Sequence, residues 1–231
     1  MLRRAIVVGA SLLVATAASI AAPAAGAKTA RSVYPSEGVG QVTSAGAWAG
    51  STSSRGLCLQ SLTCPLVKNS APGGGVGGAG DGYLRTDVGS LLGVGASSTG
   101  AWQSRSFVYH GADGRAPKVL TFRLFRRTDD ATLLRVAGND AYFTAAIVNA
   151  KSGNAVVEPF HHQALTPRSS WTKFGPKRLV RHVLRRGHSY RIRVTSTFVN
   201  GAEVVPGAST GYDNFQVVAK RHLRRHRHHH R

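Results

Sequence analysis

The sequence predicts an all-β fold, either a β-sandwich or a barrel. From Tyr83 onward apolar and polar residues alternate with a period of two, and turn residues separate the alternating runs. Of the 231 residues 42% are hydrophobic, so the chain can bury a core of its own. Many short strands divided by frequent turns are typical of sandwiches and barrels. One segment, Leu179–Leu184 before Gly187, fits a short capped helix as well as a strand.

The clearest alternation gives the positions of the expected strands. They cover Trp102–Tyr109, Lys118–Arg126, Tyr142–Val148, Ala155–Glu158, Ser189–Val199 and a last strand with Phe215 and Val217. Leu120, Phe122 and Leu124 fall on one face of the second strand, which is the expected core face. Arg191 and Arg193 fall on the solvent face of the fifth strand.

The N-terminal residues have the pattern of a secretory signal peptide. Arg3 and Arg4 precede the apolar run Ala5–Ala22, and residues 25–27 form a small-residue cleavage pattern. We therefore expect residues 1–27 to be removed and the mature protein to be secreted. The general secretory route and the twin-arginine route both remain open, and an uncleaved membrane anchor is the alternative.

Small and polar residues predict two flexible stretches around a cysteine pair. Residues 28–56 are rich in Gly and Ser and are expected to form a flexible linker, with a single strand near Trp48 as an option. Cys58 and Cys64 follow, and in an exported chain they are expected to form a disulfide that closes a short loop. A pair of free buried thiols is the alternative. The glycine-rich residues 71–82 form the second flexible stretch and lack a phosphate-loop signature.

The net charge of +20 is concentrated in two regions of the chain. Residues 220–231 form a basic tail with five histidines and no acid, and no acid lies between Glu158 and Glu203. Such charge binds polyanions through counterion release. Anionic wall polymers suit an exported chain better than nucleic acid does, and a solvated tail that only aids solubility is the alternative. The candidate polyanion-binding residues are Lys220, Arg221, Arg224, Arg225, Arg227 and Arg231.

A series of short motifs along the chain carries a resemblance to a known fold family. They are, in order, Trp102 and Phe107, Leu120–Leu124, Trp171-Thr172, Leu184–Val194 and the closing Gly211–Val217, which contains the dipeptide Asp213-Asn214. Their order resembles that of galactose-binding-like jelly rolls and the carbohydrate-binding modules built on them. The chain is also similar to a group of secreted actinobacterial proteins. The resemblance implies an antiparallel jelly-roll β-sandwich of eight strands over residues 57–219, with its two ends close together.

The resemblance also implies a metal-binding role for Asp213. In jelly-roll sugar-binding modules an acid in the last strand often ligates a structural Ca²⁺, which makes Asp213 a candidate calcium ligand. A hard cation needs about six oxygen ligands, and the sequence does not assign the others. The alternative is that Asp213 and Asn214 cap a strand edge through side-chain hydrogen bonds.

The sequence offers little for catalysis. Ten carboxylates occur in the whole chain, and the adjacent pair Asp129-Asp130 lies in an expected turn. A glycosidase needs two carboxyl groups that face each other across a cleft. Neither a nucleophile elbow nor a zinc-protease motif is present. We therefore predict no catalytic residue.

Sugar binding would combine an aromatic face with polar side chains that bond to hydroxyl groups. The candidate ligand-binding residues are Trp102, Tyr109 and Arg85. Seven positions separate the two aromatic residues, so in one unbroken strand they would face opposite ways, and at most one is expected to be exposed.

These observations together predict a secreted, monomeric, non-catalytic protein of the cell envelope. Its folded domain would bind carbohydrate, and its tail would bind anionic wall polymer. A small extracellular glycan hydrolase and a structural envelope protein without a ligand are the alternatives.

Overall fold

The fold is taken from a computed structural model of the chain. The structure describes residues 30–34, 48–55, 67–88, 91–92, 95–111, 119–130, 138–180, 182–201, 204–205 and 207–220. The regular elements in these ranges are all strands, and none of the described residues belongs to a helix that could span a membrane. The predicted signal peptide, Cys58, Cys64 and the tail beyond Lys220 lie outside the described residues.

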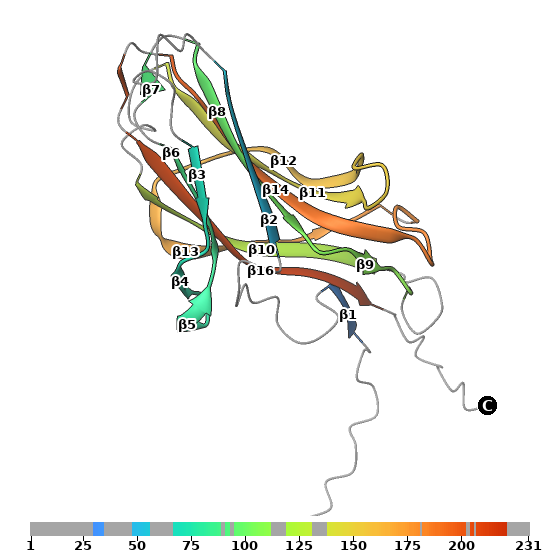
Figure 1. The fold of residues 1–231 in the computed structure, drawn as a ribbon. Coiled ribbons are helices and arrows are strands. Elements are labelled where there is room, and N and C mark those ends of the chain that lie inside the picture. The colour runs from blue at the N-terminus through green and yellow to red at the C-terminus, as the bar shows by residue number, and fades with distance from the viewer. Residues whose placement is uncertain are drawn as a thin grey trace, which may run out of the picture.

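Two antiparallel sheets of six strands form the layers of a sandwich (Figure 1). Sheet A has the order β13-β10-β16-β6-β3, with β1 beside β16. Its strands are β1 Ala30–Tyr34, β3 Val67–Ser70, β6 Leu84–Val88, β10 Val119–Asp130, β13 Arg168–Arg178 and β16 Ala208–Lys220. Sheet B has the order β12-β11-β14-β8-β2, with β9 beside β14. Its strands are β2 Trp48–Arg55, β8 Ser97–Ser104, β9 Phe107–Val108, β11 Asp140–Asn149, β12 Ala155–Ala164 and β14 Ser189–Val199.

Two small pairs complete the described elements. The strands β4 Gly73–Gly75 and β5 Gly78–Gly82 form a hairpin, and β7 Leu91–Leu92 pairs with β15 Val204–Val205. The prediction that residues 71–82 are a flexible stretch is therefore wrong, because residues 73–82 form a hydrogen-bonded hairpin.

The strand order confirms the expected jelly roll. The eight strands β6, β8, β10, β11, β12, β13, β14 and β16 follow one another along the chain. The first, eighth, third and sixth of them are neighbours in sheet A, and the second, seventh, fourth and fifth are neighbours in sheet B. This order is that of two Greek keys wound into a jelly roll. Ala30 of β1 lies opposite Lys220 of β16, so the two ends of the described fold are adjacent.

The core lies between the sheets and follows the predicted alternation. Leu120, Phe122 and Leu124 of β10 are buried against inward-facing residues of sheet B, such as Phe143 and Ile192. Burial of side chains of this size contributes about 1.5–3 kcal/mol each. The alternating pattern of β10 and β14 therefore fixes which face of each strand meets the other sheet.

One charged side chain, Arg126, lies on the core face of β10. It is 1% exposed, and its Cζ atom lies 4.8 Å from the ring centroid of Phe174 and 5.5 Å from that of Phe143. Its Nη1 and Nη2 atoms donate to the carbonyl of Ala164 at 3.2 Å and to Thr166 Oγ1 at 3.1 Å. Burial lowers the pKa of this guanidinium. Arg126 thereby ties β10 to the connection between β12 and β13.

The structure corrects the N-terminal boundary of the domain. The prediction that residues 28–56 are a flexible linker is wrong for β1, which pairs with β16. The strand expected near Trp48 is present as β2, which pairs with β8. Trp48 of β2 is buried and packs against Phe215, with 4.7 Å between the ring centroids. Most side chains of β2 are small and exposed, so its backbone pairing leaves no alternating pattern in the sequence.

The segment Leu179–Leu184 is neither a strand nor a regular helix in the part of it that the structure describes. Leu179 directly follows β13, and its N–H donates to the carbonyl of Leu120 at 2.8 Å. Turns are present at His182 and at Arg186-Gly187, and the φ of Gly187 is 76°. This left-handed backbone is the conformation that glycine adopts at little cost.

Tyr34 makes the docking of β1 dependent on pH. The ring packs against Phe107 and Trp48, and burial raises the pKa of its hydroxyl to about 12 despite a hydrogen bond with Ser104. Between pH 10 and 12 the folded protein keeps this proton while the unfolded chain loses it. The stabilisation from Tyr34 is thus complete below pH 10 and is lost as the pH rises to 12.

We expect Tyr34→Phe to remove this part of the alkaline loss of stability. Denaturant unfolding of the wild type and the variant at pH 9, 10, 11 and 12 measures the difference in the free energy of unfolding. That difference should shift in favour of the variant only above pH 10. A constant difference over the whole range would contradict the role of Tyr34.

Candidate functional site

The two aromatic residues predicted to bind a ligand are core residues. Trp102 is 4% exposed and Tyr109 is 3% exposed. Trp102 Nε1 donates to Thr86 Oγ1 of the opposite sheet at 3.2 Å. The chain leaves the strand conformation at Arg105, between β8 and β9, and this break lets both rings point inward. Neither presents a ring face at the surface, so these positions do not support stacking on a ligand, and their role in binding stays a prediction.

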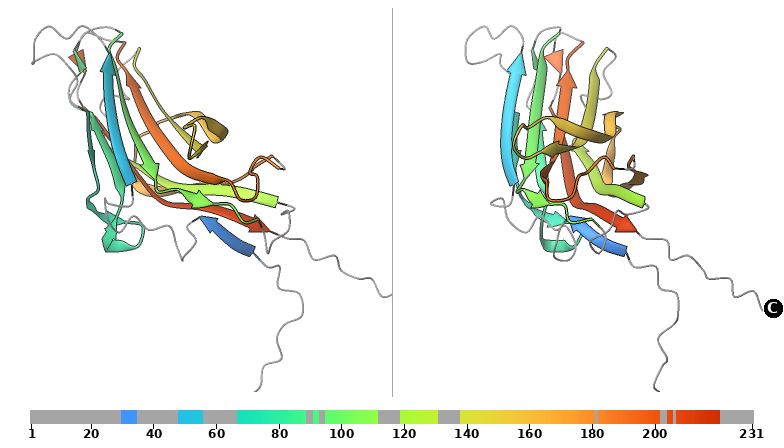
Figure 2. Two further views of the ribbon diagram at one scale, coloured as in Figure 1. Left: turned by 45° about the vertical axis from the view of Figure 1, so that its right-hand side comes forward. Right: turned by 90° about the vertical axis from the view of Figure 1, so that its right-hand side faces the viewer.

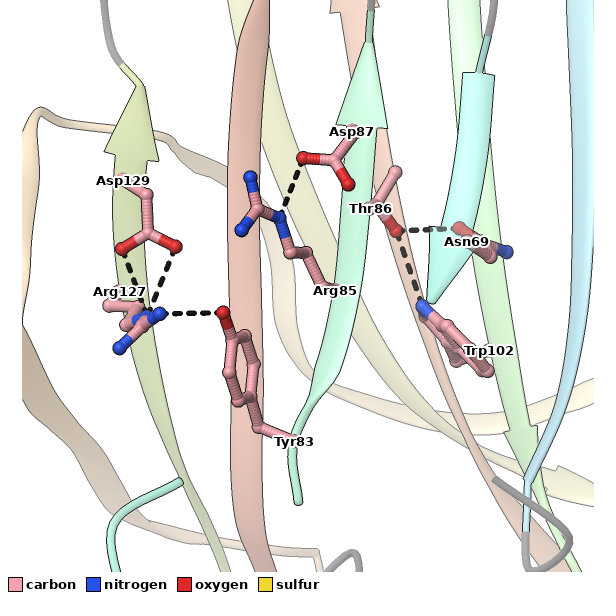
Figure 3. Close-up of polar contacts among 8 residues, drawn as sticks. All are labelled: Asn69, Tyr83, Arg85, Thr86, Asp87, Trp102, Arg127 and Asp129. Carbon is pink, nitrogen blue, oxygen red and sulfur yellow. Dashed lines mark hydrogen bonds and ion pairs between the residues drawn. The ribbon is translucent and has the colours of Figure 1, made fainter. Parts of the chain in front are cut away.

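The third predicted ligand-binding residue, Arg85, lies on the outer face of sheet A. Its Nε atom pairs with Asp87 Oδ1 at 2.7 Å (Figure 3). Burial opposes the charge of Arg85, but the hydrogen bond and charge of Asp87, together with Tyr83, raise the pKa of the guanidinium overall. Across β16, Arg127 forms a second pair with Asp129, at 2.9 Å. Asp129 is thus engaged by an arginine.

The calcium candidate Asp213 lies on β16 beneath the β4–β5 hairpin. Its Oδ2 atom accepts a hydrogen bond from the N–H of Val76 at 2.7 Å, and Oδ2 of Asp81 accepts one from the N–H of Gly77 at 2.8 Å. Both carboxylates are buried, with exposures of 0% and 5%. The Asp213 carboxylate therefore anchors the hairpin by accepting a hydrogen bond from the hairpin backbone. This is a side-chain hydrogen bond of the kind that the alternative to calcium binding describes.

The same two carboxylates leave a small cradle of oxygens beside Gly75. A Cβ atom on this glycine would lie 2.7 Å from Asp213 Oδ2, 2.9 Å from Asp81 Oδ2 and 2.9 Å from the carbonyl oxygen of Gly82. Asp81 Oδ1 is also buried, without a hydrogen-bond partner. No group of three or more His, Cys, Asp or Glu side chains among the described residues could hold a metal. A cation here would rely on two acids and on backbone oxygens.

A groove runs over the outer face of sheet B. Its first part is a hollow of about 360 Å³ above β2, β8, β14 and β11. Small and polar side chains line it. They are Ala49 and Ser51 of β2, Ala101 and Gln103 of β8, Arg193 and Thr195 of β14, and Thr144 and Ala146 of β11, and the inward-facing Gly50 and Trp102 complete the lining.

A second hollow of about 270 Å³ continues the groove along the same strands. Its lining residues are Ser53, Arg55, Ser97, Thr99, Tyr142 and Thr197. They belong to the same outward rows as the lining of the first hollow, two residues further along each strand. Ser97 and Gln103 are six positions apart in β8, so the groove extends for about 20 Å along this strand. The right-hand view of Figure 2 shows the four strands side by side.

The β11–β12 hairpin forms one wall of the groove. Its turn lies close enough for Arg193 Nη1 to donate to the carbonyl of Gly153 at 3.4 Å. Farther along, His162 of β12 stacks on Tyr142 with 3.6 Å between ring centroids, and His161 pairs with Glu158 at 2.5 Å. The Tyr142–His162 stack thus gives the second hollow an aromatic border.

The groove offers hydrogen bonds from many directions and little apolar surface. Seven Ser and Thr hydroxyls and the phenol of Tyr142 line the two hollows, and no carboxylate does. Arg193, Arg55 and Gln103 add donors that can bond to hydroxyl or carboxylate oxygens. This set suits a hydroxyl-rich ligand and lacks the carboxyl pair that glycoside hydrolysis requires.

Sequence reasoning missed the groove because outward Ser and Thr residues are what any solvated strand carries. A usable signal is a pair of small hydroxyl residues two positions apart in each of three strands, namely Ser51 and Ser53, Ser97 and Thr99, and Thr195 and Thr197. Which strands are neighbours, however, is decided by the topology.

The predicted basic regions do not form one patch. Arg191 and Arg193 point outward from sheet B, whereas Lys173 and Arg178 lie on β13 at the edge of sheet A. Lys220 is exposed at the end of β16. The other tail cations lie outside the described residues, so their role in polyanion binding stays a prediction.

Solved structures similar to this chain include carbohydrate-binding modules. The family 11 carbohydrate-binding module of the cellulase Lic26A-Cel5E of Clostridium thermocellum has a TM-score of 0.38 and 12% identity, and the match covers 87% of this chain and 99% of that module. The solution structure of CtCBM11 has a TM-score of 0.39 and 14% identity, with 84% and 98% covered.

A glycoside hydrolase domain, Endo-D from Streptococcus pneumoniae R6, matches with a TM-score of 0.41 and 11% identity over 74% of this chain. The chain spans only 22% of that protein. No protein-family model and no curated protein sequence matches this chain. Because all three TM-scores lie below 0.5, the jelly-roll assignment rests on the strand order. The similarity to actinobacterial proteins stays a prediction.

Proposed function

We propose that the protein is a secreted, non-catalytic carbohydrate-binding protein whose ligand lies in the groove of sheet B. The observation that carries this proposal is the open groove itself, which is lined by hydroxyls, Gln103 and two arginines and by no carboxylate. Sugar hydroxyls both donate and accept, so they match such a lining. The length of the groove favours a polymer chain over a single sugar.

The groove is preorganised by the sheet beneath it. Arg193 is held against the turn at Gly153, and Thr99 and Thr197 lie with their hydroxyls 3.3 Å apart across two strands. Side chains that are already ordered lose little entropy when a ligand binds. A rigid array of this kind favours recognition of one face of an extended polymer.

Removal of the central donors of the groove tests this function. We expect Arg193→Ala combined with Gln103→Ala to weaken binding at least about tenfold, because hydrogen bonds from charged groups contribute about 1.5–3 kcal/mol. Calorimetry with β-linked hexasaccharides of glucose, mannose, galactose and N-acetylglucosamine measures the change.

The matched control is Arg178→Ala, which removes a cation from sheet A. It should bind as the wild type does. If the double variant keeps full affinity for a sugar that the wild type binds, the groove is not the binding site.

We also propose that the cationic tail holds the secreted protein on anionic wall polymer. Support comes from the sequence of residues 221–231 and from Lys220, which projects at the start of the tail. Electrostatic binding of this kind weakens steeply with salt.

Deletion of residues 221–231 tests the tail. We expect the deletion to lower retention on purified cell walls strongly at 50 mM salt and to have no effect at 1 M salt. Co-sedimentation of the full and shortened mature chains measures retention. Equal retention at low salt would contradict the proposal.

We further propose that Asp81 and Asp213 hold a structural Ca²⁺ together with the carbonyl oxygen of Gly82. Two buried carboxylates that point at one place repel each other unless a positive charge lies between them. The cradle beside Gly75 consists of oxygens, which are the ligands that Ca²⁺ prefers. Bound calcium would fix the β4–β5 hairpin on β16.

Chelation tests this metal site. At calcium concentrations about 100 times the Kd, binding adds about 2.7 kcal/mol, so EDTA should lower the Tm of a chain of this size by about 5–10 °C. Asp213→Asn should make the Tm insensitive to EDTA, and Asp140→Asn, an exposed acid on sheet B, should leave the EDTA effect unchanged. A wild-type Tm that EDTA does not alter would exclude the metal.

A further inference from the structure

The outer face of sheet A carries a cluster that lies on the opposite side of the sandwich from the groove. We name it the arginine–aromatic cluster, and Figure 3 shows its polar contacts. Its members are Tyr83 before β6, Arg85 and Asp87 of β6, Arg127 and Asp129 of β10, and Trp171 of β13.

Gly211 of β16 forms the floor of the cluster. Arg127 lies opposite this glycine on one side and Arg85 on the other, so the two arginines are two strands apart in one row. A Cβ atom on Gly211 would come within 2.8 Å of Tyr83 Cε2. The absent side chain therefore lets the Tyr83 ring lie on the central strand between the two arginines.

The arginine side chains are held in place from several directions. The Cζ atom of Arg127 lies 4.3 Å from the ring centroid of Tyr83 and 5.0 Å from that of Trp171, and its Nη2 donates to the Tyr83 hydroxyl at 2.5 Å. Asp129 accepts from its Nε atom. Asp87 holds Nε of Arg85 in the same way. Both guanidinium groups are thus fixed before any ligand arrives.

The charge balance of the cluster indicates the class of ligand. Each guanidinium is already neutralised by a carboxylate at 2.7–2.9 Å, so the four charged groups carry no net charge. An anionic group placed here would meet Asp87 and Asp129. A neutral hydroxyl can accept from an arginine and donate to an aspartate at the same time.

The aromatic part of the cluster completes a surface for a sugar. Tyr83 is buried beneath the others, whereas Trp171 is half-buried and contacts Tyr83 edge-on at 5.3 Å. The part of the indole that remains exposed can pack against the C–H face of a sugar ring, next to the fixed donors and acceptors.

We propose that the arginine–aromatic cluster is a second binding site, for a neutral sugar with adjacent free hydroxyl groups. This second site rests on the proposed function only in assuming that the ligand is a carbohydrate, because it uses none of the groove residues. With sites on opposite faces, one chain can bridge two polymer strands and gain avidity without a second copy.

Binding stoichiometry tests the proposal. Calorimetry uses the same four hexasaccharides of β-linked glucose, mannose, galactose and N-acetylglucosamine, at 50 mM and at 500 mM salt. We expect two sites per wild-type chain for at least one of them and one site in Trp171→Ala, with little effect of salt. Lys173→Ala, its outward neighbour on β13, is the matched control and should keep two sites.

Two further variants guard against misfolding and separate this site from the groove. Asp87→Asn with Asp129→Asn keeps the shape of the cluster, and we expect it to weaken the second site about tenfold. Arg193→Ala with Gln103→Ala should remove the groove site and leave the cluster site intact.

Fluorescence gives an independent readout of the cluster. Of the three tryptophans, Trp48 and Trp102 are buried, so iodide quenching should report mainly on Trp171. A sugar that occupies the cluster should reduce this quenching, and it should do so equally in the groove variant.

The possible outcomes distinguish the two sites. One site per chain that Trp171→Ala and the double Asn variant leave unchanged would overturn the second site and leave the groove proposal standing. One site that Trp171→Ala removes and the groove variant keeps would support the second site and overturn the groove. No binding of any hexasaccharide by the wild type, with unchanged iodide quenching, would overturn both.

Discussion

The rest of the structure depends on the burial of β16 on both of its faces. Inside, Tyr212 and Phe215 pack in the core, and outside the strand is covered by Tyr83 at Gly211 and by the β4–β5 hairpin at Asp213. A buried backbone must pair along both edges, so β10 lies on one side of β16 and β6, followed by β1, lies on the other. This pairing sets the register of sheet A. It also brings together the arginine–aromatic cluster and the pair of buried carboxylates.

The two outer faces of the sandwich differ in chemistry because different side chains cover them. Sheet B presents short Ser, Thr and Ala side chains with Arg193 and Tyr142 at intervals, which leaves a groove above the strands. Sheet A presents long side chains that fill their own surface, with arginines stacked between aromatic rings and paired with acids. One face is therefore hollow and basic, and the other holds a compact neutral cluster. The proposed groove site and the proposed site at the arginine–aromatic cluster follow from this contrast, and neither requires a conformational change.

Much of the fold could be predicted because alternation survives wherever one face of a strand is buried. For this reason the alternation identified Leu120, Phe122 and Leu124 as the core face of their strand. The pattern failed for β2, which has small exposed residues, and for the glycine hairpin, whose strands are held by backbone bonds. Alternation also failed to show that Trp102 and Tyr109 both point inward. The chain leaves the strand conformation between β8 and β9, so inward and outward positions cannot be counted from one strand into the other. Asp213 was recognisable as a notable acid, but its neighbour Asp81 is more than a hundred residues away in the chain.

The sequence by itself determined the all-β class, the core face of the main strands and the basic character of the tail, since period, composition and charge are local properties. The tertiary structure alone decided which strands became neighbours, and so which polar residues share a face. Ser51, Thr99, Thr195 and Thr144 are unremarkable in their own strands and form a groove only when four strands lie side by side. Likewise Arg85 and Arg127 lie in one row only because both pair with the same glycine of β16. A jelly roll places distant segments together, and such contacts leave no trace in local sequence.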